Sequence, residues 1–258
     1  MTKHDPHKVA EERLITMNSR LESLHCQGQS SEEIIELADD AWSLIMESSP
    51  NKYSGAICQW IKLAYFRLPK KMWAKGDLWK NRELAQHTLA GYKRGIANVL
   101  MGNAFDHIDV YGDLDSALGI LDVMRLIVEN TEEDDLYPNV LMNRLYHEKR
   151  AFCMWFVKCY SDSVEEYEKA LPFAVEESNR DKSKRAVLKV SGGWTLASYF
   201  SDLDGEGREE AQAKADWIIS ESANDPELSG IFDDTTHNLN LMKSGCRDRD
   251  EFKPYDII

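Results

Sequence analysis

"SSEEIIELADDAWSLIMESSP", residues 30–50, repeats its apolar side chains at the spacing of an α-helix and leaves its acids on the other faces. We expect one helix here, with a single buried face. Ser30 and Glu33 suit a capping box at its start, because each side chain can accept a hydrogen bond from the backbone N–H of the other. Pro50 ends the helix. The expected buried residues are Ile34, Leu37, Ala41, Leu44 and Ile45.

The preceding segment, residues 5–26, has the same period. Asp5 and Pro6 suit the start of a helix, and Gly28 suits its end. Because only a short loop separates this segment from the next one, the two predict an antiparallel helical hairpin. The apolar stripe of the first helix consists of Leu14, Met17, Leu21 and Leu24.

Helical periodicity continues along the rest of the chain, which has only 14 Gly and 7 Pro in 258 residues. No segment shows the alternating pattern of a strand, so we predict an all-α chain of antiparallel hairpins, stacked as a solenoid or packed as an irregular bundle. We place one helical domain at residues 1–244 and a charged tail at residues 245–258. Further helices are expected at 52–68, 81–102, 114–129, 139–160, 161–179, 181–200 and 207–223.

The stretch "YSDSVEEYEKAL", residues 160–171, has a small residue, Ser163, then Tyr167 four positions later and Ala170 three after that. This spacing resembles the second half of a tetratricopeptide repeat. Residues 111–124 are similar to the same half-repeat, and residues 25–42 resemble it more loosely. The resemblance implies a degenerate tetratricopeptide-like α-solenoid with an adaptor or regulator role, and it places Tyr167 between two helices. The matching positions in 111–124 are Gly112, Ala117, Leu121 and Met124.

The composition excludes several classes of protein. Net charge is −14, from 31 basic and 45 acidic residues, and this opposes docking on DNA or on an anionic membrane. The N-terminal residues show no signal peptide, and no apolar run is long enough to span a bilayer. Five cysteines without a CxxC pair indicate free thiols in a reducing cytoplasm.

Recognisable catalytic motifs are missing from the sequence: it has no Gly-rich phosphate loop, GxSxG elbow or HExxH pair. We therefore expect no catalytic residue and no cofactor. The most enzyme-like stretch is "DHIDVYGDLD", residues 106–115, whose carboxylates could hold a hard cation. Its order does not match an EF-hand, and Asp113 or Asp115 suits the simpler role of capping the next helix.

The stretch "LPKKMWAKGDLWKNR", residues 68–82, carries five basic residues, two tryptophans and one acid within an acidic chain. Pro69 and Gly76 predict an exposed connection between two helices. Cations beside aromatic rings are typical of interface hot spots and suit an acidic peptide segment. The expected partner-binding residues are Lys70, Lys71, Trp73, Lys75, Trp79 and Arg82.

Two other interpretations of this stretch remain open. Trp60 and Phe66, just before the stretch, can belong to a helix core while the lysines pair with acids of the same chain. Alternatively, the surface can bind single-stranded nucleic acid, which the net charge disfavours. In the first case the stretch has no partner at all. The interpretations differ in whether the aromatic rings and the cations are exposed.

These observations predict a non-enzymatic protein-protein interaction module that is a monomer or weak dimer and binds no membrane, and they disfavour nucleic acid as its partner. The alternative is an acidic inhibitor or immunity-type protein that neutralises a basic enzyme, such as a nuclease, through its carboxylates. A third interpretation is a metal-dependent enzyme built on residues 106–115. The first two differ in which surface binds, and the third requires a bound metal.

Overall fold

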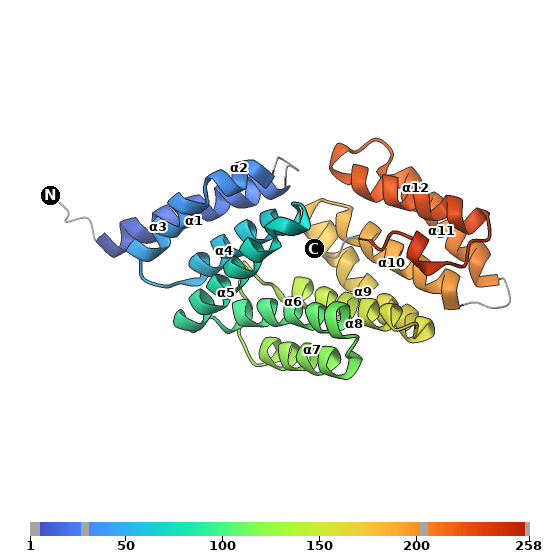
Figure 1. Cartoon of the computed structure of the whole chain (residues 1–258), viewed down its shortest axis with the longest axis horizontal. Coiled ribbons are helices and arrows are strands. Elements are labelled where there is room, and N and C mark those ends of the chain that lie inside the picture. The colour runs from blue at the N-terminus through green and yellow to red at the C-terminus, as the bar shows by residue number, and fades with distance from the viewer. Residues whose placement is uncertain (1–5, 27–30, 202–205, 256–258) are drawn as a thin grey trace. The chain divides into compact units, whose positions relative to one another are not determined.

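The computed structural model describes residues 6–26, 31–201 and 206–255, and every regular element among them is a helix (Figure 1). The predicted all-α class is therefore confirmed. Ser30 and Gly28, the expected cap and stop of two helices, lie outside the described residues. None of the described helices combines the length and apolar character needed to cross a membrane.

The chain forms two compact units, divided between Val99 and Leu100 inside one helix. The predicted single domain, residues 1–244, spans both. The helices of the first unit are α1 (Pro6–Cys26), α2 (Ser31–Glu36), α3 (Ala38–Glu47), α4 (Lys52–Phe66), α5 (Trp73–Leu89) and the start of α6 (Lys93–Tyr111). The helices of the second are the remainder of α6, α7 (Leu114–Glu129), α8 (Asn139–Phe156), α9 (Tyr160–Asp181), α10 (Arg185–Ser201), α11 (Glu206–Ser222) and α12 (Ser229–Lys243).

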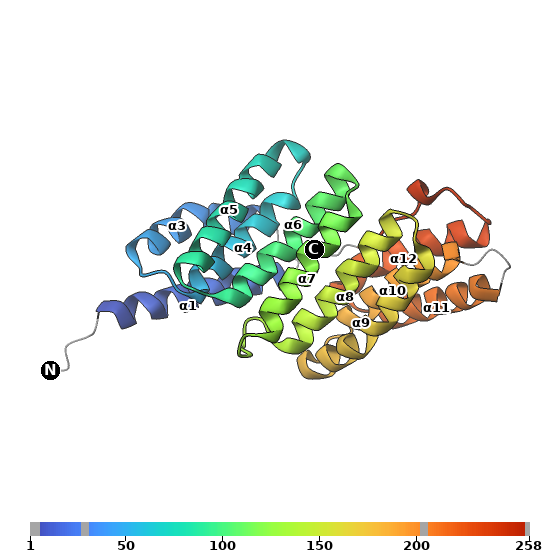
Figure 2. The same ribbon diagram turned by 90° about the horizontal axis from the view of Figure 1, so that it is seen from below.

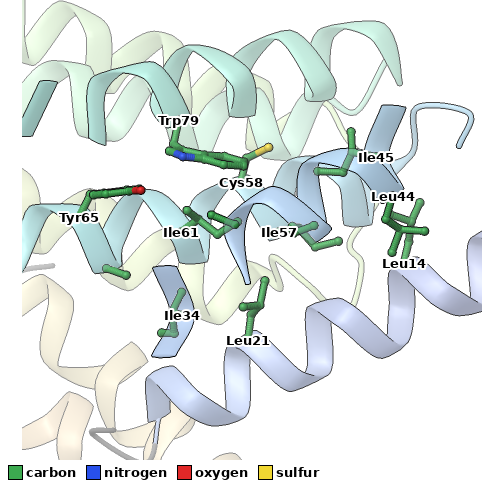
Figure 3. Packing of buried hydrophobic residues seen from close by; sticks show 13 residues of the cluster. Leu14, Leu21, Ile34, Leu44, Ile45, Ile57, Cys58, Ile61, Tyr65 and Trp79 are labelled. Carbon is green, nitrogen blue, oxygen red and sulfur yellow. The ribbon is translucent and has the colours of Figure 1, made fainter. Parts of the chain in front are cut away.

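The core of the first unit joins α1, α2, α3 and α4 around fully buried aliphatic side chains (Figure 3). Leu14 of α1 lies beside Leu44 of α3, and Leu21 lies near Ile34 of α2. The expected stripe on α1 is thus confirmed at Leu14 and Leu21, which are completely buried. Met17 and Leu24 pack against the same cluster but stay half-buried.

The helix predicted over residues 30–50 is divided at Leu37 into α2 and α3. The Leu37 N–H donates to the Ile34 carbonyl at 3.2 Å, a tighter turn than the α-helix makes. The turn changes the register, so that Ala38 becomes buried while Leu37 is half-buried. The other four residues of the expected face are buried as predicted.

Helix α5 begins at Trp73, so most of the segment predicted as an exposed connection is helical. Gly76 does not break the helix, which continues through it. A Cβ atom at this position would lie 2.5 Å from the Phe66 ring of α4. The glycine instead lets α4 and α5 pack closely. Helix α5 ends later, next to Gly91, which has a φ of +63°. The Tyr92 N–H donates to the His87 carbonyl and closes this end of the helix. The helix predicted over 81–102 is therefore two helices.

In the second unit, helices consecutive in sequence lie side by side from α7 to α12 (Figure 2). The helix predicted at 114–129 matches α7. Tyr167 is buried, as expected, and the completely buried Ser163 donates from its hydroxyl to the Ala151 carbonyl at 2.7 Å. Gly112 differs from the half-repeat pattern: it is exposed, with a φ of +63°, directly after α6.

The stretch "SGGW", residues 191–194, lies inside α10, which continues through it unbroken, and it is a point of close packing. A Cβ atom on Gly193 would lie 2.3 Å from the Tyr167 ring, and one on Gly192 would lie 2.4 Å from the Tyr255 ring. The two adjacent glycines therefore each receive an aromatic ring. The predicted charged tail is packed over its described residues, with Phe252 and Tyr255 both buried.

We predict that Gly193→Ala destabilises the protein by about 1–3 kcal/mol, because the added methyl group overlaps the buried Tyr167 ring. Gly119→Ala in α7 is the matched control, since its new methyl group has no atom within 4 Å beyond its chain neighbours and the backbone of its own helix. It should raise the stability by up to about 1 kcal/mol through helix propensity alone. Urea unfolding followed by circular dichroism measures both changes. Equal effects of the two substitutions would contradict the packing of Tyr167 on Gly193.

Candidate functional site

The residues predicted to bind a partner are placed at the start of α5 and along its first turns. A 3-10 turn, η1 (Lys70–Met72), leads into the helix. Lys71 and Lys75 are exposed, and Trp73 is 39% exposed. We call Lys71, Trp73 and Lys75 the Trp73 surface. The side chain of Lys70 lies outside the described part of the structure.

Trp73 is held in place although more than a third of it is accessible. Its indole N–H donates to the Leu68 carbonyl at 3.0 Å. The ring meets Phe66 of α4 edge to face, with 6.1 Å between centroids and an interplanar angle of 85°. The Lys75 ammonium lies 5.7 Å from the centroid of the Tyr65 ring, next to Phe66 in sequence. An orientated aromatic ring loses little side-chain entropy when a partner covers it.

The electrostatics of the helix start favour an anion. No acidic residue lies in the first turn of α5, and its N-cap residue, Met72, makes no side-chain capping bond. The positive end of the helix dipole therefore adds to the charges of Lys71 and Lys75. The closest acid in sequence, Asp77, pairs with Lys80 at 3.9 Å, between side chains 61% and 21% exposed.

Trp79 and Arg82 are not part of this exposed surface. Trp79 is only 3% exposed and meets Trp42 of α3 edge to face, with 5.8 Å between centroids. The Arg82 guanidinium lies 3.9 Å from the Trp42 ring and 4.5 Å from the Trp79 ring. The exposed position predicted for Trp79 is therefore wrong, because its own chain already covers the ring. Trp79 is therefore unavailable to a partner in this structure.

A buried ion pair further reduces the charge available to a partner. The Lys62 ammonium contacts the Glu83 carboxylate at 2.7 Å, and the Asn98 amide donates to the other carboxylate oxygen at 3.3 Å. Glu83 is completely buried and Lys62 nearly so. The ion pair joins α4 to α5, and the Asn98 bond adds α6. It could not be predicted from the sequence, because 21 residues separate Lys62 from Glu83.

His87 lies in the same polar centre, between two glycines. A Cβ atom on Gly55 or on Gly95 would lie within 2.1–2.4 Å of its ring. Burial and the charge of Lys62 lower the pKa of His87 to about 4. The imidazole is therefore neutral near pH 7 and packs as an aromatic ring against Tyr92, at 5.3 Å between centroids.

A second polar cluster, in the other unit, ties α7, α8 and α9 together. The His147 Nδ1 atom lies 2.8 Å from one oxygen of Glu166, and the Lys169 ammonium lies 2.9 Å from the other. Arg150 and the Tyr146 hydroxyl both donate to Asp122 of α7, at 3.2 Å and 2.9 Å. A histidine paired with a carboxylate can hold and move a proton, but here each carboxylate also neutralises a cation.

Glu166 is the strongly shifted acid of this cluster. Burial alone would raise its pKa, but hydrogen bonds from His147 and Lys169 and the charge of Arg150 outweigh burial and lower the pKa to about 2. Glu166 is therefore ionised at neutral pH. Its charge stabilises the contact between α8 and α9.

The acidic stretch at 106–115 is divided by the end of α6. Asp113 caps α7: one carboxylate oxygen accepts from the Ser116 N–H at 3.0 Å and the other from its hydroxyl at 2.6 Å. The side chains of Asp106 and Asp109 lie outside the described residues. In the described part of the chain, no three His, Cys, Asp or Glu side chains converge as metal ligands.

Comparison of the chain with protein-family models, with curated proteins and with solved structures finds no match.

We predict that Lys62→Met destabilises the protein by about 3–5 kcal/mol, because it leaves the Glu83 carboxylate buried without its cation. The double variant Lys62→Met/Glu83→Gln should regain much of this loss, since a neutral amide needs no counter-charge and can still accept from Asn98. Urea unfolding measures both variants. Additive losses in the double variant would show that the two side chains are not coupled.

We also predict that the stability contributed by Glu166 is lost as pH falls. Its folded-state pKa of about 2 lies below the ordinary value of 4.5, so its contribution is complete above about pH 4.5 and declines toward pH 2. Glu166→Gln should therefore be less stable than the wild type at pH 7, with a difference that narrows between pH 4.5 and 3. Urea unfolding across this range tests it, with the exposed Glu165→Gln as the control. A difference independent of pH would contradict the lowered pKa.

Proposed function

We propose that this protein is a non-enzymatic interaction module whose Trp73 surface binds an acidic segment of a partner protein. The main support for this proposal is the position of Trp73, which lies beside two exposed lysines. Its side chain is 39% exposed, and contacts with Leu68 and Phe66 hold it in one orientation. The ring offers apolar area, and the lysines and helix dipole select carboxylates. A segment with Asp or Glu next to an apolar side chain matches both features.

The tetratricopeptide-like interpretation supports the adaptor role within this proposal. Consecutive antiparallel helices and the buried Ser163, Tyr167 and Ala170 agree with the packing positions of that family. Proteins of this kind bind partners through surfaces of stacked hairpins. We place the interaction in the cytoplasm, which the free thiols of Cys58 and Cys153 support.

Charge reversal on the Trp73 surface tests the proposal. The double variant Lys71→Glu/Lys75→Glu should fold normally, since changes at exposed sites usually alter stability by less than about 0.5 kcal/mol. Captured partners, quantified by mass spectrometry after a pull-down from the native cell, should fall at least tenfold relative to the wild type. Trp73→Ala should cause a similar loss, because interface tryptophans contribute strongly to affinity.

The matched control is Lys158→Glu/Lys182→Glu, which makes the same change in net charge at exposed positions of the other unit. It should retain the wild-type set of partners. If the Lys71/Lys75 variant and this control capture the same proteins in the same amounts, the Trp73 surface binds no partner and serves only the packing of α4 on α5.

A further inference from the structure

The described C-terminal residues form an ordered segment that is not part of any helix pair. We call residues 247–255 the C-terminal strap. It follows α12 after Gly245, whose φ of +75° turns the chain back. It contains one short 3-10 turn, η3 (Arg249–Glu251), and then continues extended, with φ −81° and ψ 144° at Phe252.

Two aromatic side chains anchor the C-terminal strap on α10. The Phe252 ring lies 5.6 Å from the Tyr199 centroid and 5.0 Å from the Phe200 centroid, the latter edge to face. Tyr255 lies over Gly192, where any side chain larger than glycine would overlap its ring. Its hydroxyl donates to the Thr235 hydroxyl of α12 at 2.9 Å. Both rings are about 95% buried, at 4% and 5% exposure.

Side chains of α12 recognise the backbone of the C-terminal strap. The side-chain amide of Asn238 makes two hydrogen bonds. Its NH2 group donates to the Lys253 backbone carbonyl at 2.8 Å, and its Oδ1 atom accepts from the Lys253 backbone N–H at 2.9 Å. The His237 Nε2 atom lies 2.9 Å from the Glu251 carbonyl. Two hydrogen bonds from one side-chain amide to an extended backbone, here called the clamp, bind the main chain whatever its side chains are. Sites that bind extended peptides use bonds of this kind.

Charged groups fix the ends of the same segment. Arg249 donates to the Phe156 carbonyl of α8, and its guanidinium lies 5.2 Å from the Trp155 ring. The Lys253 ammonium lies 3.3 Å from Asp234 of α12. The C-terminal strap is thus held by a main-chain clamp, by peripheral charges and by two aromatic anchors that join the buried cluster between α10, α11 and α12. A bound extended peptide is held by the same kinds of contact.

We propose that the surface contacted by the C-terminal strap is a peptide-binding site for extended segments with two aromatic residues three positions apart, and that the strap occupies it in the resting protein. The surface consists of Gly192, Tyr199 and Phe200 of α10 with Thr235, His237 and Asn238 of α12. The partner is a protein segment that presents Phe or Tyr at both positions and displaces the strap. This site is separate from the Trp73 surface and does not depend on the function proposed for it.

The covalent connection sets how strongly the strap competes. A tethered ligand acts at an effective concentration of about 1 mM, so a strap with an intrinsic Kd of about 10 μM would weaken an external peptide about a hundredfold. Opening the strap should therefore increase the affinity for an external peptide by a similar factor. A segment that only completed the core would instead cost the protein its helical structure when its anchors are removed.

The test uses a fluorescein-labelled peptide of sequence "RDRDEFKPYDII", residues 247–258, and full-length protein. In the variant Phe252→Ala/Tyr255→Ala the chain's own anchors are removed and the site is left intact. Fluorescence anisotropy should show that the labelled peptide binds this variant about 30- to 100-fold more tightly than it binds the wild type, because the tethered strap no longer competes for the site. A peptide with alanine at both aromatic positions should not bind it.

A third protein carries Asn238→Ala in addition to Phe252→Ala/Tyr255→Ala. It should bind the labelled peptide at least tenfold more weakly than the double variant, because the clamp on the Lys253 position is lost. Two results would overturn the proposal. One is equal binding of the peptide to the double variant and the wild type. The other is loss of the helical circular dichroism signal in the double variant, which would make the strap part of the core.

Discussion

Both units depend on helices that pack closely where a glycine faces an aromatic ring. The Phe66 ring packs on Gly76, and the Tyr167 ring packs on Gly193, each across a pair of adjacent helices. His87 lies between two glycines in the same manner. A methyl group at any of these positions would separate the helices and open space beside the ring, which packed interiors do not tolerate. The rings themselves can then be large without increasing the distance between helix axes.

The same constraint explains which boundaries could be predicted from the sequence. The helix at 114–129 was predicted correctly because its cap, Asp113, and its apolar period are both local signals. Gly76 was interpreted as a helix breaker, since glycine usually weakens a helix and the sequence does not show the Phe66 ring opposite it. The division at Leu37 also could not be predicted, because the stripe of apolar residues continues across it.

The burial of Trp79 shows a second reason for failure. The buried residues of α5 are Gly76, Trp79, Glu83, Gln86 and His87, a regular helical stripe. Three of the five are polar or ionisable, so a search for apolar periodicity does not detect the stripe. Their burial depends on partners from other helices, such as Lys62 and Asn98, that only the fold brings within reach. The sequence therefore predicted the tryptophans as a pair, whereas the fold separates them.

The fold also changes what the basic stretch can contribute to binding. Residues 60–94 hold nine basic and two acidic residues, yet Lys62 and Arg94 are buried and Arg82 lies against the Trp42 and Trp79 rings. The positive field around the proposed binding surface is therefore weaker than the sequence suggests. Exposed charges mainly increase an association rate and orientate a partner, and they are screened by salt. In the complex we propose, most of the binding free energy comes from covering the Trp73 ring, which the contacts with Leu68 and Phe66 hold at the start of α5.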